Sequence, residues 1–276
     1  MRKLFCEISP LTYLISVEKE RALRNCKDFI SQALFASEKS EDYLPIVINK
    51  HNSLIRRKLG NVDMELQENK ATNLSIAAPK INKILIQPNE VFSFWKLVGK
   101  PTKKKGYRNG LTISSGKTSS GLGGGMCQFT NLIHWMVLHT SLTIIEHHHH
   151  DAYDLFPDFN RQIPFGTGTS IMYNYLDYRF KNNTNKTYQI IVTVTDEYLC
   201  GEIRCNAREE VKYHIQSEDE YFSKEGNDVY RNGKVYRKAI DVRTGLCIKK
   251  ECIRENHAKV LYDSSTLIIK KEANQD

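Results

Sequence analysis

Residues 123–137 read GGGMCQFTNLIHWMV, and this stretch decides the fold that we expect. Its apolar side chains recur at the spacing of one helix face, and they are Phe129, Leu132, Ile133, Met136 and Val137. The three glycines that come first allow positive φ angles and a close approach of the backbone to another group. We therefore predict a tight glycine loop that leads directly into a buried helix carrying a cysteine.

Cys127 lies in the first turn of this predicted helix. The unpaired N–H groups and the positive dipole end at a helix start favour a thiolate, so we expect a lowered pKa for Cys127. The same N–H groups, with the side-chain amide of Gln128, are candidates for an oxyanion hole. The candidate substrate-binding backbone is that of Gly124, Gly125 and Met126. The alternative interpretation is that Cys127 is a small, buried, apolar residue.

A nucleophilic cysteine needs a base, and this base is most often histidine. The run His147–His150 follows a predicted strand, so alternation places His148 and His150 on one face and His147 and His149 on the other. His134 and His139 lie on the predicted helix itself, and we expect them to be structural or exposed. The run is also typical of a metal-binding surface tract. Candidates for the residue that orients the histidine are Asp151, Asp154 and Asp177.

The other patterns predict an α+β fold in which the cysteine-bearing helix packs on a mainly antiparallel sheet. Helical periodicity extends over residues 1–60 and 61–90, and the glycine- and lysine-rich stretch 99–125 is expected to be a loop. Strands are expected at 142–145, 170–180, 188–195 and 199–205, the last two as a hairpin.

The C-terminal residues are expected to form a small β appendage. Residues 206–220 are interpreted as a connection, and Asn232-Gly233 and Arg243-Thr244-Gly245 as hairpin turns. The predicted organisation is a helical N-terminal region (1–60), a central domain (61–205) and a C-terminal β-hairpin appendage (206–276).

The composition indicates a globular protein whose partner is anionic. The 276 residues are 40% hydrophobic and 26% charged, with a net charge of +8, and no apolar run is long enough to span a membrane. Residues 91–145 contain seven bases and no Asp or Glu, which favours an acidic ligand. The alternative interpretation is a solvated basic face. Nucleic acid is not expected, because no recognisable nucleic-acid-binding motif accompanies the charge. Contact with an acidic membrane surface stays open.

The seven cysteines are an odd number and are sparse for a disulfide-stabilised secreted domain. The N-terminus lacks the apolar core of a signal peptide, so we expect a cytoplasmic protein with reduced thiols. The Cys200/Cys205 and Cys247/Cys252 spacings do not favour a zinc site, and we predict no metal and no cofactor.

The sequence resembles the VanW-like family over about residues 61–205. The motifs that carry the resemblance are Phe92-Ser93-Phe94-Trp95, Gly106-Tyr107, Gly123-Gly124-Gly125-Met126-Cys127-Gln128, Leu138-His139-Thr140, Leu142-Thr143-Ile144-Ile145, Tyr175-Leu176-Asp177 and Asn182-Asn183-Thr184. The resemblance implies a bacterial cell-envelope protein connected with vancomycin resistance or peptidoglycan metabolism. Some family members are understood to be cysteine-dependent peptidoglycan transpeptidases.

Carried over to this chain, the resemblance makes Cys127 the nucleophile and places the family's histidines at His148 and His150, with His150 as the first choice of base. Two positions depart from the family pattern: Gly168 stands where an Asp is usual, and Asn174 stands where a Gly is usual. If the usual Asp orients the histidine, either this chain is impaired or Asp177 takes that role.

We therefore expect attack of the Cys127 thiolate on a carbonyl of a peptidoglycan stem peptide or cell-wall precursor, with Lys104 and Arg108 attracting the anionic substrate. The alternative is a non-catalytic accessory protein that binds a precursor or a glycopeptide. A site of action in the envelope would require an unconventional route of export.

Overall fold

The computed structural model describes residues 4–57, 63–114, 117–149, 152–155, 157 and 163–270. Its helices are α1 (Pro10–Ile30), α2 (Met64–Ile81), α3 (Phe94–Val98) and α4 (Met126–Val137), with short 3-10 turns η1 (Phe5–Glu7) and η2 (Lys103–Lys105). Its strands are β1 (Ile46–Leu54), β2 (Ile84–Ile86), β3 (Val91–Ser93), β4 (Asn109–Ser114), β5 (Lys117–Leu122), β6 (Thr143–Glu146), β7 (Tyr153–Asp154), β8 (Arg179–Lys181), β9 (Tyr188–Val194), β10 (Tyr198–Cys205), β11 (Val211–Glu225), β12 (Asp228–Asp241) and β13 (Cys247–Val260).

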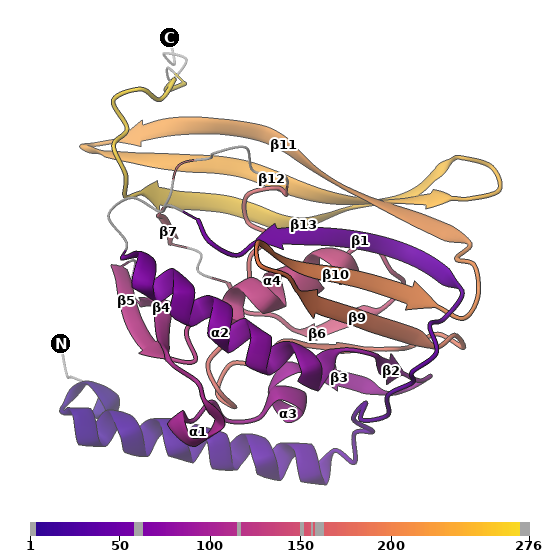
Figure 1. Cartoon of the computed structure of the whole chain (residues 1–276). Coiled ribbons are helices and arrows are strands. Elements are labelled where there is room, and N and C mark those ends of the chain that lie inside the picture. Colours follow the sequence, from indigo (N-terminus) through magenta and orange to yellow (C-terminus); the bar gives the residue numbers. More distant parts are fainter. Residues whose placement is uncertain are drawn as a thin grey trace.

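The predicted α+β class is confirmed, and the sheets are mainly antiparallel (Figure 1). One sheet has the order β1-β10-β9-β2, and a small second sheet has the order β3-β8-β6. The long strands β11, β12 and β13 form a curled sheet on the side of the molecule away from α1, with β7 parallel to β13 at its edge. No helix among the described residues is both long and apolar enough to cross a membrane.

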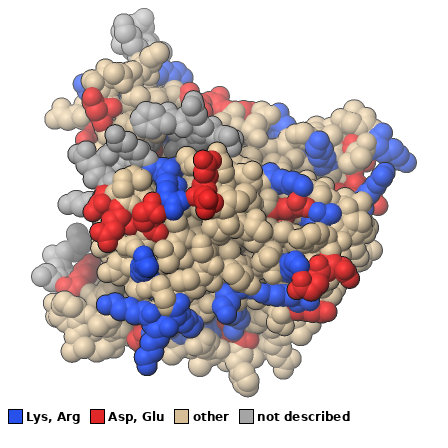
Figure 2. All heavy atoms as spheres, in the orientation of Figure 1, with Lys and Arg blue, Asp and Glu red and all other residues tan. Residues whose placement is uncertain are grey.

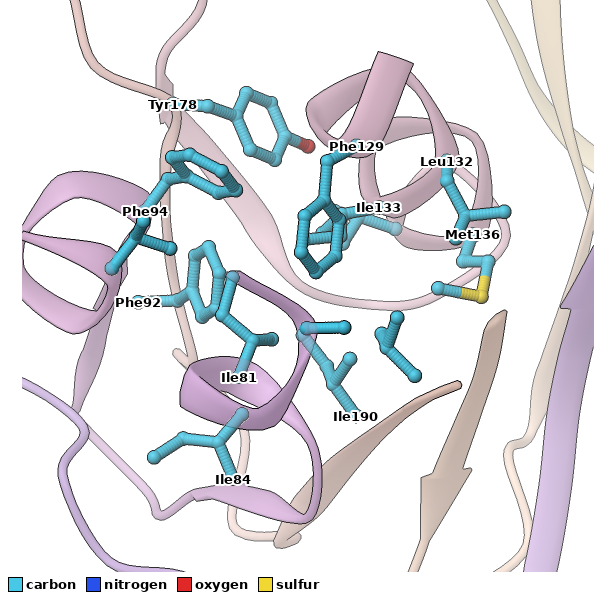
Figure 3. Packing of buried hydrophobic residues seen from close by; sticks show 14 of the residues in the cluster. Ile81, Ile84, Phe92, Phe94, Phe129, Leu132, Ile133, Met136, Tyr178 and Ile190 are labelled. Atoms are coloured by element: carbon cyan, nitrogen blue, oxygen red, sulfur yellow. The ribbon is translucent and has the colours of Figure 1, made fainter. Parts of the chain in front are cut away.

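The core lies between helices α2 and α4 and the β1-β10-β9-β2 sheet. Figure 3 shows Phe129, Leu132, Ile133 and Met136 of α4 pointing into it, as the helical stripe predicts. The packing leaves no room for a side chain at Gly201 of β10, because a Cβ there would lie 2.8 Å from Met136 Cε. The sequence pattern therefore identified the helix that the sheet covers.

The N-terminal helix α1 is attached to this body mainly by polar contacts. Among its described residues only Val17 is buried. Arg24 forms an ion pair with Glu146 (2.6 Å), and Asp28 forms one with Arg179 (2.6 Å). Large apolar side chains along η1 and the first half of α1 stay exposed, among them Leu11 (66% exposed).

Several expected elements were wrong. Residues 46–54 form strand β1 rather than helix, although the helical expectation holds for Pro10–Ile30. Hairpin β4-β5 lies inside the expected loop 99–125. Of the expected strand 170–180, only Arg179 and Phe180 lie in a named strand, β8, and the expected connection 206–220 contains most of β11.

The expected turn at Asn232-Gly233 was also wrong, because both residues lie in the middle of β12. A bulge in β11 between Glu218 and Tyr221 lies opposite Gly233, and a Cβ on Gly233 would lie 3.1 Å from Glu220 Cγ. The glycine therefore accommodates the bulge. The hairpin turn lies at residues 226–227 instead, whereas the turn at 243–245 is confirmed.

The start of α4 is fixed by contact between two backbones. A Cβ on Gly124 would lie 2.3 Å from the carbonyl carbon and oxygen of Gly110 in β4. Asn73 of α2 fastens the same contact, donating to Gly124 O (2.9 Å) and to Arg108 O (3.0 Å) and accepting from the Arg108 N–H (2.8 Å). Only glycine fits at position 124.

We expect Gly124→Ala to lower the free energy of unfolding by about 3 kcal/mol or more, because backbone rather than a flexible side chain blocks the added methyl. Gly226→Ala is the control, since nothing lies within 4 Å of the added atom. Its left-handed backbone costs about 1 kcal/mol with alanine. Urea unfolding measures both values, and equal losses would contradict the close contact.

Candidate functional site

Cys127 lies in the first turn of α4. This helix begins directly after Gly125, whose backbone is left-handed (φ 105°). No side chain of the described residues caps this helix start. The thiol is partly buried, and this burial raises the pKa of Cys127, although a backbone hydrogen bond from Ile171 acts in the opposite direction. The expected lowering of the Cys127 pKa is therefore wrong, because loss of solvent outweighs the helix-end effect. The resting group is a neutral thiol.

An irregular segment, residues 167–171, lies beside Cys127 and contacts its helix. Thr169 donates through its N–H (2.6 Å) and its hydroxyl (2.8 Å) to Asn131 Oδ1, one turn beyond the cysteine. The hydroxyl group of Thr169 also lies 3.4 Å from the carbonyl oxygen of Cys127. The Ser170 hydroxyl is buried in the same segment without a hydrogen-bond partner among the described residues. A polar group of a ligand would satisfy it.

The same segment holds the histidine run in place. His147 Nε2 donates to Gly168 O (2.8 Å), and the Ser170 N–H donates to His148 O (2.7 Å). The histidines and the cysteine are therefore linked through one short stretch of chain. His150, the first choice of base, and Asp151 lie outside the described residues.

His147 and His134 are stacked, with ring centroids 4.3 Å apart. Burial lowers the pKa of His147 and lowers that of His134 well below its ordinary value. A carbonyl only accepts hydrogen bonds, so His147 carries its proton on Nε2. Both rings are therefore neutral at pH 7. The expectation that His134 is structural agrees with its burial on α4.

His149 lies beside Gly168, one of the two positions at which the sequence departs from the family pattern. A Cβ on Gly168 would lie 3.3 Å from His149 Nε2 and 3.9 Å from Asn131 Oδ1. A carboxylate at position 168 would thus contact this imidazole. The nature of residue 168 therefore bears directly on the surroundings of His149.

The acid that contacts His148 is Glu146, at 3.0 Å, and sequence reasoning missed it. Glu146 is partly buried, forms an ion pair with Arg24 of α1 and accepts from the Asp177 N–H (2.8 Å). No sequence pattern marked it, because its partner Arg24 is far away in the chain.

Asp177 is fully buried in a different set of contacts. Its carboxylate accepts from the Ser93 hydroxyl (2.5 Å), from the Trp95 N–H (3.1 Å) and from Arg179 Nε (2.8 Å). It therefore fixes the start of α3 rather than a histidine. Asp154, the other described candidate, lies in β7 and contacts Arg231 (3.4 Å) and Tyr262 (3.1 Å).

The remaining predicted site residues, which include Gln128, Met126 and Arg108, lie in different surroundings. Gln128 uses its amide nitrogen to donate to Ser53 Oγ and Leu54 O, both at 2.8 Å, so this side chain ties α4 to β1. Met126 is buried in the core. The exposed Arg108 lies next to the glycine loop, because its carbonyl accepts from the Gly123 N–H (3.0 Å).

Lys104 is exposed on η2. Figure 2 shows Lys and Arg side chains spread over the lower part of the face in view, with Asp and Glu among them. Among the described residues, no group of three or more His, Cys, Asp or Glu is arranged to hold a metal ion.

Sequence reasoning also missed Lys70 of α2, which lies against the start of α4. A Cβ on Gly125 would lie 2.2 Å from Lys70 Cγ, and Lys70 is only 5% exposed. Burial lowers the pKa of Lys70 to about 7, and the charges of Arg57 and Arg56 lower it further. One turn earlier, the buried amide of Gln67 has no hydrogen-bond partner among the described residues. The helix start is therefore flanked by buried polar groups.

Comparison with known proteins gives a consistent result. The family model described as "VanW like protein" matches residues 69–204. The Vancomycin B-type resistance protein VanW of Enterococcus faecalis is 34% identical over 241 residues, which cover 87% of each chain. The uncharacterized protein YoaR of Bacillus subtilis is 30% identical over 122 residues, 43% of this chain and 37% of YoaR. No solved structure matches.

We expect Lys70→Met to stabilise the protein at pH 7 by about 2–4 kcal/mol, because the cation is costly to bury and the methionine retains the contact with Gly125. The folded-state pKa of Lys70, about 7, lies below its unfolded value of roughly 10.4. The cost is therefore complete below pH 7 and declines as the pH rises toward 10.

Urea unfolding at several pH values between 7 and 10 measures this effect. The wild-type protein should gain stability over this range relative to Lys70→Met, and Lys224→Gln, at an exposed position on β11, should follow the wild type. Parallel curves for wild type and Lys70→Met would contradict the assignment.

Proposed function

The chain belongs to the VanW family, and on this premise we propose that it is a cysteine-dependent acyl transferase acting on peptidoglycan in the context of glycopeptide resistance. The substrate in this proposal is a stem peptide, either in the wall or in a cell-wall precursor. The name of the E. faecalis relative supports the resistance context.

The observation that carries the proposal is the 167–171 segment. It contacts the helix turn of Cys127 through Thr169 and the histidine run through Gly168 and Ser170. A thiol and several imidazoles are thereby held on either side of one stretch of chain. This is the pair of groups that nucleophilic catalysis by cysteine requires.

The protonation states favour general-base catalysis rather than a resting thiolate–imidazolium pair. Burial raises the pKa of Cys127 and lowers that of His147, so both groups rest neutral at pH 7. A neutral thiol has a proton to give, and a neutral imidazole has a lone pair to receive it. The base comes from the run His147–His150, with His150 as first choice and His148 as second.

In the first step, the thiol proton moves to the imidazole as sulfur bonds to the carbonyl carbon of a stem-peptide amide. The uncapped N–H groups at the start of α4 stabilise the oxyanion. The C–N bond then breaks, and the imidazolium returns its proton to the leaving amine. An acceptor amine attacks the thioester, its proton passes to the imidazole, and the sulfur leaves and is reprotonated.

A second candidate is a non-catalytic protein that binds a wall precursor or a glycopeptide. The buried thiol, whose pKa is raised, specifically favours this candidate, because structural cysteines are buried and inert. The two candidates differ in whether removal of the sulfur changes the products.

Cys127→Ala should abolish transfer between stem peptides, measured by mass spectrometry of muropeptide products, while stem-peptide binding is retained. Cys200→Ala, a partly buried cysteine on β10, is the matched control and should keep full activity. An acyl adduct on Cys127 in the wild type would directly support the thioester. Full transfer by Cys127→Ala would overturn the catalytic proposal, and binding without turnover in the wild type would favour the second candidate.

Gly168→Asp should increase the rate of transfer several-fold, because a carboxylate placed against the histidine run at His149 stabilises the imidazolium that forms in this run during attack. Gly168→Asn has a similar shape without the charge and serves as the control. The pH dependence of the rate separates the two variants. Equal rates for Gly168→Asp and Gly168→Asn would exclude an electrostatic role for this position.

A further inference from the structure

The start of α4 presents backbone N–H groups that can converge on a ligand. Gly125 has a left-handed backbone and the helix begins at the next residue, a sequence of conformations that turns successive N–H groups toward one point. Within the described part of the chain, the N–H groups of Gly125 and Met126 have no hydrogen-bond partner, and that of Cys127 lies only against its own sulfur. The positive end of the helix dipole lies at the same place, so an anion is favoured there.

A row of polar side chains on α2 runs along the glycine loop. Helix α2 passes beside β4 and the start of α4 (Figure 1). Asn73 donates to Gly124 O (2.9 Å), and one turn earlier the carbon chain of Lys70 lies against Gly125. The next residue of the row is Gln67, since positions three apart share one face of a helix. The row therefore follows the chain from the glycine loop toward the first N–H groups of α4.

Lys70 brings a positive charge to this place without a counter-charge. It is 5% exposed and forms no hydrogen bond or ion pair with any described residue. Its Cδ lies 3.0 Å from the Cβ position of Gly125, and Nζ is two bonds farther, within about 5.5 Å of that position. The nearby acid Glu68 pairs with Arg56 instead (2.5 Å). The charges that act on Lys70 are therefore positive ones.

The amide of Gln67 is a second buried group that lacks a partner. The residue is fully buried, and neither its nitrogen nor its oxygen is hydrogen-bonded to a residue that the structure describes. Unpaired buried amides and ammonium groups cost free energy of folding. A ligand that accepts hydrogen bonds from the amide nitrogen and from Lys70 would recover much of this cost. Two such groups beside one helix start therefore indicate an occupant.

We propose that the start of α4, together with Lys70 and Gln67, binds a phosphate dianion, either free or at the end of a phosphate monoester. A phosphate group offers several strong acceptor oxygens, which suits a set of backbone N–H groups with one ammonium beside them. The glycines at 124 and 125 allow the ion to approach the backbone closely. Because Lys70 is nearly covered, a terminal phosphate fits this site better than the interior phosphate of a diester.

The phosphate site does not depend on the proposed function, but the two meet at the same N–H groups. The oxyanion of the proposed transfer reaction forms where these groups point. A bound phosphate shares the tetrahedral shape and the negative charge of that intermediate, so it competes for the same donors. The inference therefore includes inhibition of transfer by phosphate.

Thermal unfolding of the full-length protein at pH 7 and constant ionic strength tests the site. Inorganic phosphate at about 20 mM should raise the Tm of the wild type by about 3–5 °C, because it binds only the folded state. Dimethyl phosphate, a diester with a single charge, and chloride should not. Phenyl phosphate separates the two sources of the ligand: a shift like that of phosphate shows that monoesters enter, and no shift restricts the site to the free ion.

Lys70→Met and Gln67→Leu should each lose at least half of the phosphate shift. Both substitutions replace an unpaired buried polar group with an apolar one of similar size, so both variants should fold. Lys224→Gln, at an exposed position on β11, is the control for total charge and should keep the full shift. The general stabilising effect of phosphate salts is common to all variants and is removed by this comparison.

Nuclear magnetic resonance with ¹⁵N-glycine labelling locates the ion. Phosphate should move the Gly125 amide resonance, while those of Gly226 and Gly245, in open turns, should stay in place. Equal Tm shifts for wild type and Lys70→Met, or a Gly125 resonance that does not move at saturation, would overturn the inference.

The outcomes for the site and for the proposed function can be told apart. If transfer is found, saturating phosphate should lower its rate about five-fold or more, and an unchanged rate would overturn the phosphate site while the proposed function stands. If phosphate moves the Gly125 resonance in a protein that shows no transfer, the site stands and the proposed function fails.

Discussion

The fold around the candidate site depends on two positions that carry no side chain. Gly124 lies against the backbone of Gly110, and Gly125 turns the chain beneath the side chain of Lys70. Any larger residue would push the start of α4 away from β4 and α2. The location of Cys127, the exposure of its thiol and its distance from the 167–171 segment all follow from this contact.

Two carboxylates also connect elements that lie far apart in the sequence. Asp177 connects the start of α3 to β8, and Glu146 connects α1 to the histidine run. Each accepts several hydrogen bonds, including one from a backbone N–H. Removal of Glu146 would take away the ion-pair partner of Arg24, and removal of Asp177 would leave Arg179 to Asp28. Such networks hold separate elements in register. The histidine run is thus positioned by ion pairs that extend to the N-terminal helix.

Sequence reasoning succeeded where the signal is local and failed where it is distant. The apolar stripe from Phe129 to Val137 predicted α4, and alternation predicted the hairpin of β9 and β10. Strand β1 was missed because its extended form depends on pairing with β10, far along the chain. The Asn232-Gly233 pair is a strong turn signal that a bulge in the facing strand overrides. Cys127 lies in the first turn of α4 as the motif predicts, but burial reversed the expected direction of its pKa, and the periodicity gave no indication of Glu146 or Lys70.

The pairing of β1 with β10 also sets the point during synthesis at which the central sheet can form. Strand β1 ends at residue 54, and its partner begins at residue 198. Helix α4 packs directly on Gly201 of that partner, so the part of its apolar face that meets β10 stays uncovered until β10 has left the ribosome. A nascent chain shorter than about two hundred residues therefore presents an unpaired strand and an incompletely covered core.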